Sequence, residues 1–462
     1  MDGTGLRWTV AAAIAAACGV TGFAKAETLE SALALAYRNN PTLNAQRASL
    51  RATDEGVPQA LAGYRPKINV TWDNDYQYYE THALSSGSFV SAHSPISPRG
   101  GSVNLVQTVY NGERNGSLTR QAESSVLSAR EMLRNVMQTA LLDAATQYMN
   151  VLRDSAILDL QRRNVQVLQE QLKQTRDRFN VGEVTRTDVA QAESRLAAAQ
   201  SQVLAAEANL KASQAAYRRA IGVEPVNLRP GMPVDRLSPR SQDAAIEMGR
   251  AEHPTVTSAQ HTVDAAQHAV KAAEGSLYPT ITVEANATKR WDSAVGSYDT
   301  TTVTGLTRFT VPIYQGGSEY SIIRQAKETL GQRRIELDIQ RDMVRANVVQ
   351  AWSQLEATKA QIIAAQAQVT ATEVALNGVR EEARVGQRTT LDVLNAQQEL
   401  VNARVSLVTA QRDRVVASYT LLAAVGRLDP GRLSLATEEY DPRTHYHQVR
   451  DQWIGVRNPD GR

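Results

Sequence analysis

Apolar residues spaced alternately three and four positions apart mark two long segments of the chain. Such heptad spacing predicts helices that pack along one seam against a neighbouring helix. Because alanine recurs along both seams and lets backbones approach closely, we expect helices packed side by side in a sheet or cylinder. The two seams are Val189, Ala192, Leu196, Ala199, Val203, Ala206, Leu210, Ser213, Tyr217 and Ala220, and Val393, Ala396, Leu400, Ala403, Leu407, Ala410, Arg414, Ala417, Leu421 and Ala424. Arg414 is the single departure in the second seam.

The second seam repeats the first because the chain contains two copies of one sequence pattern, an internal duplication. Two prolines of the first copy recur 213 residues later and three glycines recur 204 residues later, so one segment of the second copy is shorter by nine residues. Two tandem copies favour one architecture with similar halves over three independent domains. The recurring pairs are Pro41 and Pro254, Pro66 and Pro279, Gly112 and Gly316, Gly182 and Gly386, and Gly222 and Gly426.

Each copy predicts the same series of elements. The first copy, residues 27–222, is expected to contain a helix over 28–64, strands over 67–80 and 100–110, a long helix over 113–181 and a returning helix over 185–222. The second copy, residues 241–426, is expected to contain a helix over 242–277, strands over 280–291 and 301–313, a long helix over 317–384 and a returning helix over 388–426. Residues 223–240 would link the copies, and residues 427–462 would form a tail. At about 1.5 Å per residue the long helices reach on the order of 100 Å, which excludes an ordinary globular core.

Apolar and polar residues alternate along the predicted strands. Ile68, Val70 and Trp72 alternate with polar residues in the first copy, as do Ile281 and Val283 in the second. This alternation is typical of a membrane barrel strand with one face toward lipid, but a soluble sandwich strand has the same pattern. Four strands cannot close a barrel in lipid without unbonded edges, so several chains must contribute, and three would supply twelve strands.

The two copies differ most in the length of the segment that joins their first strand to their second. Residues 81–101 are rich in serine, glycine and proline, and their counterpart around 292–299 is shorter. Exposed loops tolerate such changes in length. We therefore expect both segments to be exposed loops.

The first 26 residues predict a cleaved secretory signal. Arg7 precedes an apolar run over residues 8–20, and Ala24-Lys25-Ala26 provides a cleavage site. A lipoprotein signal with lipidation at Cys18, the only cysteine, is the alternative. No apolar segment of 18 or more residues follows Ala26, so we expect no membrane-spanning helix.

Charge and motif content exclude several classes of function. The 50 basic and 48 acidic residues leave a net charge of +2 without a basic stripe, so we expect no nucleic-acid partner. The sequence has no phosphate-binding loop, zinc-protease motif or serine-hydrolase elbow, so we expect no enzyme, no cofactor and no metal site. His445 and His447, two residues apart in the polar tail, are expected to be solvated.

Four segments of the sequence resemble the TolC family of trimeric outer-membrane export channels. The resemblance spans about residues 28–426, and the four segments are Arg178-Phe179-Asn180-Val181-Gly182, Thr187-Asp188-Val189, Val311-Pro312-Ile313-Tyr314-Gln315-Gly316-Gly317 and Val385-Gly386-Gln387-Arg388-Thr389-Thr390-Leu391-Asp392-Val393-Leu394. It implies an α+β membrane protein in a Gram-negative bacterium. Three chains would form a 12-stranded β-barrel in the outer membrane, continuous with a 12-helix coiled-coil tunnel across the periplasm.

The resemblance also implies a function and partners. The homotrimer would be a passive exit duct for proteins in type I secretion, or for drugs and small molecules. An inner-membrane ABC or RND-type pump and a periplasmic adaptor would deliver the cargo, and outer-membrane lipid would surround the barrel. Helix patterning alone also permits a different class, a non-conducting elongated coiled-coil scaffold in the periplasm.

Specific roles follow from the resemblance at the two turns that end the long helices. Asp392 aligns with an acid at the narrowest end of the tunnel, and Asn395 stands one turn further on, where another family member has a second acid. Arg388 aligns with an arginine of the closed-state latch, with Thr187 and Asp188 as its partners. The adaptor would dock on Val181, Gly182, Glu183, Val385, Gly386 and Gln387.

The residues themselves predict a structural role for the same turns. Thr185 followed by Asp188, and Thr389 followed by Asp392, are capping-box patterns at the start of each returning helix. An acid in the first turn also complements the positive end of the helix dipole. Capping by itself therefore accounts for both aspartates without any function.

Overall fold

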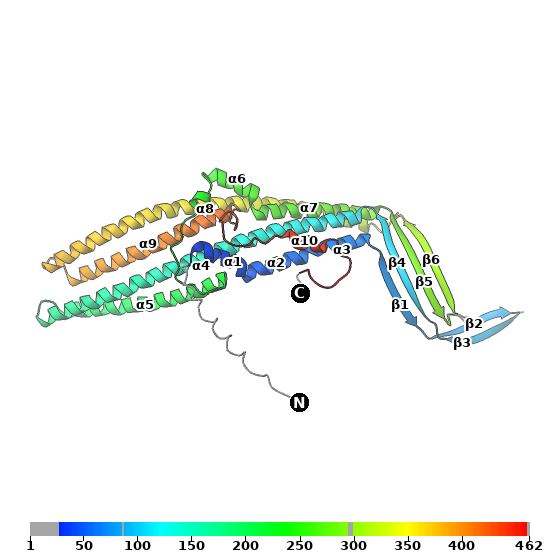
Figure 1. The fold of residues 1–462 in the computed structure, drawn as a ribbon, viewed down its shortest axis with the longest axis horizontal. Coiled ribbons are helices and arrows are strands. Elements are labelled where there is room, and N and C mark those ends of the chain that lie inside the picture. Colours follow the sequence, from blue (N-terminus) through cyan, green and yellow to red (C-terminus); the bar gives the residue numbers. More distant parts are fainter. Residues whose placement is uncertain (1–26, 86, 294–298, 460–462) are drawn as a thin grey trace, which may run out of the picture.

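Two helical hairpins of unequal arms make up most of the molecule. The computed structural model describes residues 27–85, 87–293 and 299–459, so the predicted signal peptide and part of the loop around 292–299 lie outside the described residues. Helices α4 (Arg114–Asn180) and α8 (Ser318–Arg384) contain 67 residues each. Helices α5 (Arg186–Ile221) and α9 (Thr390–Ala424) return beside them. Figure 1 shows both hairpin turns at one end of the molecule and the strands at the other.

Shorter helices cover the strand-proximal half of the long ones. Helices α1 (Leu29–Asn39), α2 (Pro41–Asp54) and α3 (Gly56–Leu61) lie along α4. Helix α7 (Pro254–Glu274) lies between α4 and α8, and α6 (Gln242–Glu252) contacts α8. Three 3-10 turns, η1 (Ala62–Tyr64), η2 (Asp235–Leu237) and η3 (Gly275–Leu277), complete this region.

The prediction of one continuous helix over 28–64 and another over 242–277 is wrong. Asn40 and His253 have extended backbones, with ψ of 119° and 126°, and both precede a proline. A residue before proline is driven out of the helical region by the proline ring, so the chain ends one helix there and begins the next. The side chains of Asn40 and His253 then cap the following helices by accepting hydrogen bonds from backbone N–H groups.

One antiparallel sheet joins the two copies. Its strand order is β1-β4-β5-β6, where β4 from the first copy pairs with β5 from the second. Within the described residues, β1 and β6 are bonded on one side only. The sheet therefore has two open edges in the single chain. Its strands are β1 (Lys67–Asn74), β4 (Arg99–Asn111), β5 (Thr280–Trp291) and β6 (Thr300–Thr310).

The register of the sheet sorts side chains onto an apolar and a polar face. Val70 of β1 pairs with Val103 of β4, which pairs with Ala287 of β5 and onward with Val303 of β6. The neighbouring row contains Thr71, Ser102 and Thr288. On the apolar face Ile68, Val70 and Trp72 are 61%, 75% and 67% exposed. Such exposure of large apolar side chains on one face marks a surface that is covered by another apolar phase or partner.

The prediction of a single strand over 67–80 followed by an exposed loop over 81–101 is wrong. Strand β1 ends at Asn74, and the chain forms a second, two-stranded sheet from β2 (Gln77–Ser85) and β3 (Ser88–Ile96). Antiparallel pairing from Gln77↔Ile96 to Ser85↔Ser88 satisfies backbone groups that a loop would leave to solvent. In the second copy β6 ends at Thr310 and not at residue 313, because Pro312 cannot donate a ladder hydrogen bond.

The largest core lies near the middle of the bundle, where the linker and the tail return to it. Buried side chains of α1, α4, α5 and α9 meet Leu428 and Leu435 of the tail there. The buried Tyr148 hydroxyl lies 2.9 Å from the Glu27 carbonyl and 2.7 Å from the Arg229 carbonyl, and burial raises the pKa of Tyr148 to about 12. The tail contains α10 (Arg443–Val449), which packs on α2. Within the described part of the chain, no helix is long and apolar enough to cross a membrane.

Candidate functional site at the two helix-hairpin tips

The two turns that join the long and returning helices have the same backbone. We call residues 181–185 the first tip and residues 385–389 the second tip. Gly182 and Gly386 have φ angles of 80° and 81°, a left-handed conformation that favours glycine. The N–H of Glu183 bonds to the Arg178 carbonyl and that of Gln387 to the Glu382 carbonyl, both at 2.9 Å. The predicted left-handed glycine at each helix end is confirmed, and two short turns result.

Both predicted capping boxes are confirmed. The backbone N–H of Thr185 donates to Asp188 at 2.9 Å, and that of Thr389 donates to Asp392 at 3.0 Å. In return Asp188 and Asp392 donate their own N–H groups to the threonine hydroxyls. The hydrogen bonds from Thr389 are the main reason that the pKa of Asp392 is lowered from its usual value. Asp392 is therefore held in its ionised form at the start of α9.

The first residue of each tip is an exposed valine. Val181 and Val385 occupy corresponding positions and are 72% and 71% exposed. Gly182 and Gly386 have no neighbouring atoms within 4 Å of the place where a Cβ would stand. Each tip thus presents a small apolar point with open space around it, and the flanking Glu183 and Gln387 are also exposed.

The charges of the two tips are reversed. In the first tip Arg178 of α4 donates to Glu183 of the turn at 3.0 Å. In the second tip the acid comes from the helix, because Glu382 of α8 accepts from Arg388 of the turn at 2.9 Å. Glu382 is the largest cause of a raised pKa for Arg388. One backbone therefore carries an acidic turn in one copy and a basic turn in the other.

The two hairpins contact each other behind the tips. Leu394 of α9 is buried in a cluster with Leu168 and Leu172 of α4 and alanines of α5. The Arg195 side chain of α5 donates to the Asn395 side chain of α9 at 2.7 Å. Asn395 is thus a bridge between the hairpins. Sequence reasoning missed this contact because it spans 200 residues between elements whose relative rotation is set by packing.

The structure does not bring the three latch residues together within one chain. Arg388 forms an ion pair with Glu382, and the Asp188 carboxylate accepts a hydrogen bond from the Thr185 backbone N–H. No hydrogen bond or ion pair between Arg388 and either Thr187 or Asp188 occurs among the described residues. The latch remains a prediction.

One residue of the tail departs from its predicted environment. The prediction that His445 is solvated is wrong, because its side chain is only 13% exposed and lies 3.0 Å from Asp54. Asp54 is fully buried at the end of α2, and this burial is the main cause of its raised pKa. A separation of 391 residues gave no sequence signal for this pair.

Comparison with known proteins decides the family. A family model described as "Outer membrane efflux protein" matches residues 32–223 and 245–427, one segment in each copy. The chain belongs to this family. It is 40% identical to the outer membrane efflux protein BepC of Brucella suis over 441 residues, which cover 95% of this chain and 94% of BepC. Over 430 residues it is 24% identical to the outer membrane protein TolC of Escherichia coli, covering 89% of this chain and 84% of TolC.

A solved structure supports the fold of this outer membrane efflux family member. The open state of the MtrE outer membrane channel of Neisseria gonorrhoeae matches with a TM-score of 0.71 and 17% identity. The match covers 87% of this chain and 89% of that one. The expected kinship with the TolC family is confirmed, and the protein belongs in the outer membrane of a Gram-negative cell.

Proposed function

We propose that three copies of this chain form a passive exit duct across the outer membrane and periplasm. The sheet supports this most directly, since it has one apolar face, one polar face and two open edges. Open edges cannot stay unbonded in lipid, so β1 of one chain would pair with β6 of the next. Three four-stranded sheets would then close one 12-stranded barrel with the polar face inside.

The helices support a tunnel that continues the barrel. At about 1.5 Å per residue, α4 and α8 each reach on the order of 100 Å from the sheet, so the tips would lie far from the outer membrane. The tips offer apolar points and fixed charges on which a periplasmic adaptor would dock: Val181, Gly182, Glu183, Val385, Gly386 and Gln387. An inner-membrane ABC or RND-type pump would supply the energy. The cargo would be protein, as in type I secretion, or drugs and small molecules.

We place the gate at the second tip. Three copies of Asp392 would ring the narrow end, with Asn395 one turn behind, and Arg388 would bind Thr187 and Asp188 of a neighbouring helix pair in the closed state. Driving a closed gate to a mostly open one takes roughly 5.5 kcal/mol of differential binding, which a docking protein can provide.

Single-channel recording in a planar bilayer tests the duct. We expect purified trimers to conduct, and a non-conducting trimer would favour the periplasmic scaffold. Val70→Arg and Thr71→Arg place the same charge on opposite faces of β1. An arginine on the lipid face costs about 2–4 kcal/mol per chain near the bilayer midplane, so we expect V70R to prevent membrane insertion.

The matched variant T71R should insert and change only the conductance, because its arginine faces the lumen. Equal insertion of both variants would contradict the barrel. Substrate export in cells that lack the native duct, assayed with a secreted protein and with a small dye, would separate the two kinds of cargo.

A further inference from the structure

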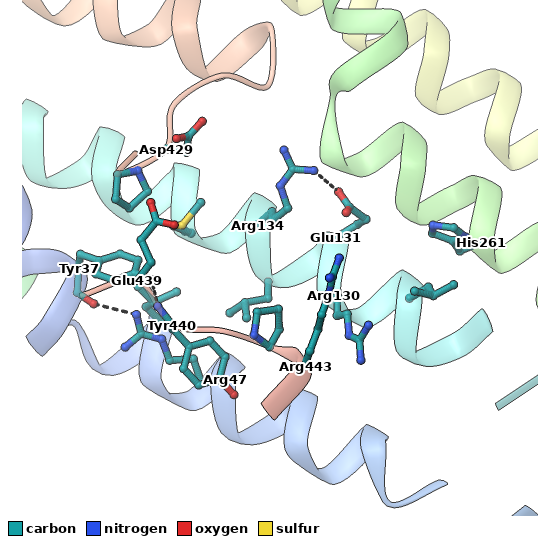
Figure 2. Close-up of a pocket in the computed structure, with 16 residues that line it drawn as sticks. Tyr37, Arg47, Arg130, Glu131, Arg134, His261, Asp429, Glu439, Tyr440 and Arg443 are labelled. Carbon is teal, nitrogen blue, oxygen red and sulfur yellow. Dashed lines mark hydrogen bonds and ion pairs between the residues drawn. The ribbon is translucent and has the colours of Figure 1, made fainter. Parts of the chain in front are cut away.

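A cavity lies between the tail and the helical body. Its volume is about 420 Å³. Residues of α1, α2, α4, α7 and the tail bound it, and Figure 2 shows them around the cavity. Arg130, which lies in its wall, is 16 residues beyond the start of α4, or about 24 Å along the helix from the strand end. The cavity is therefore remote from both the sheet and the tips.

Arginine is in excess among the charged residues of this cavity. Four arginines line it: Arg47, Arg130, Arg134 and Arg443. Three carboxylates also line it, but Glu131 is bonded to Arg134 at 2.7 Å and Asp429 is paired with Arg432 at 3.4 Å. Only Glu439 remains to balance Arg47, Arg130 and Arg443, none of which has a carboxylate within 4.0 Å in the described part of the chain.

Aromatic rings hold two of these arginines in place. The guanidinium of Arg47 lies 4.6 Å from the centre of the Tyr37 ring and 5.1 Å from that of Tyr440. Arg130 lies 5.1 Å from the centre of the Tyr446 ring in α10. Arg47 already donates to the Asn44 side chain at 2.9 Å and to the Tyr37 carbonyl at 3.2 Å. Stacking of Arg130 against its ring leaves the edge of the guanidinium, with its N–H donors, available to bind an anion.

Arg130 also has a donor that nothing in the structure uses. Its Nε atom is buried and makes no hydrogen bond to the described residues. A buried donor without a partner costs about 1–3 kcal/mol, and an acceptor that reached it would recover this energy. Apolar side chains complete the wall, among them Leu127, Leu133 and Met137.

We propose that this cavity binds a small organic anion that carries a carboxylate or phosphate group. The acidic group would accept hydrogen bonds from Arg130 and Arg443, since planar guanidinium groups match both oxyanions in a bidentate fashion. The body of the ligand would lie against Leu127, Leu133 and Met137. The location of this site in the periplasm rests on the proposed function, but binding itself does not.

Three probes with the same ring and different head groups test the proposal by calorimetry on the purified full-length protein. Phenyl phosphate and benzoate carry the two oxyanions, and benzamide carries a neutral group of similar shape. We expect saturable binding of at least one anion and none of benzamide. The stronger of the two anions identifies whether phosphate or carboxylate is the natural head group.

Variants place the binding in this cavity. We expect Arg130→Gln with Arg443→Gln to weaken anion binding at least tenfold, and Arg130→Lys to weaken it by less because the charge remains. Arg38→Gln, an exposed arginine of α1 that does not line the cavity, is the matched control and should bind as the native protein does. Arg443→Gln alone changes an exposed side chain and provides a folded variant if Arg130→Gln disturbs the helix packing.

Three outcomes would overturn the proposal: no saturable binding of either anion, equal binding of benzamide, or unchanged affinity in the arginine variants. Conductance recorded on the same samples separates this result from the proposed function. Conducting trimers that bind no anion refute the cavity alone, and non-conducting trimers that bind anion refute the duct alone.

Discussion

The two tips have the same backbone and opposite charges. Both have a left-handed glycine, a capping box and an exposed valine at corresponding positions. The first tip carries its acid, Glu183, in the turn, whereas the second carries its base, Arg388, there. Closure of a helical hairpin requires only the shared features. The features that differ are therefore free to serve the surroundings of each tip, and five experiments test this division.

The largest difference is expected at the capping acids. Asp392→Asn should weaken block of the channel by divalent cations on the order of 100-fold, because three carboxylates near one ion act together. Asp188→Asn removes the corresponding acid of the first tip, which is a proposed latch partner of Arg388, so it should raise conductance but weaken block much less than D392N does. Single-channel recordings with added divalent cation measure both. Equal effects would show that the tips share the constriction, and no effect of D392N would refute the ring.

The next largest difference is expected at the arginines of the two tip ion pairs, Arg388–Glu382 and Arg178–Glu183. Arg388→Ser should raise single-channel conductance several-fold, since the proposed latch loses its cation. Arg178→Ser breaks the corresponding ion pair of the first tip and should not open the channel. A conductance that rises equally in both variants would mean that any lost charge near a tip loosens the gate.

The glycines test what the tips share. Gly182→Ala and Gly386→Ala should each destabilise the local turn by about 1–2 kcal/mol, because an L-residue is strained at positive φ. Both sites have open space where the methyl group would stand, so the cost comes from the backbone alone and should be equal. Hydrogen exchange of the turn amides measures it, and a cost at only one tip would contradict the shared backbone.

The capping threonines should give a smaller effect of the same kind. Thr185→Ala and Thr389→Ala each remove the side-chain acceptor of a helix N-terminus, which costs about 1 kcal/mol. We expect faster amide exchange in the first turn of α5 or α9 with little change in conductance. A large change of conductance from T389A alone would show that the cap and the gate are coupled.

The smallest effect is a shift in the pH at which cation selectivity is lost. Hydrogen bonds from Thr389 lower the pKa of Asp392 within one chain. Convergence of three carboxylates works in the opposite direction, since mutual repulsion favours protonation. Selectivity falls as pH falls in either case, and a ring predicts a midpoint above the ordinary 3.8 of aspartate. A midpoint below 3.8 would indicate carboxylates that are capped but too far apart to interact.

Local patterns in the sequence determined much of this protein. The heptad seams and both capping boxes depend on residues a few positions apart, so they could be predicted without a partner element. The duplication could be read from the repetition of such local patterns along the chain. The breaks at Asn40 and His253 were also encoded locally, by Pro41 and Pro254, but the surrounding apolar periodicity hid them.

Only the tertiary structure decided which distant residues meet. Packing between the hairpins brings Arg195 to Asn395, and the returning tail brings His445 to the buried Asp54. Pairing of β2 with β3 formed a hairpin from much of residues 81–101, where composition suggested a loop. The arginine-lined cavity likewise brings α1 and α2, near the start of the chain, together with α4, α7 and the tail. Heptad and turn patterns fix the direction of each helix, whereas its rotation and neighbours depend on how whole faces pack, which no short stretch of sequence specifies.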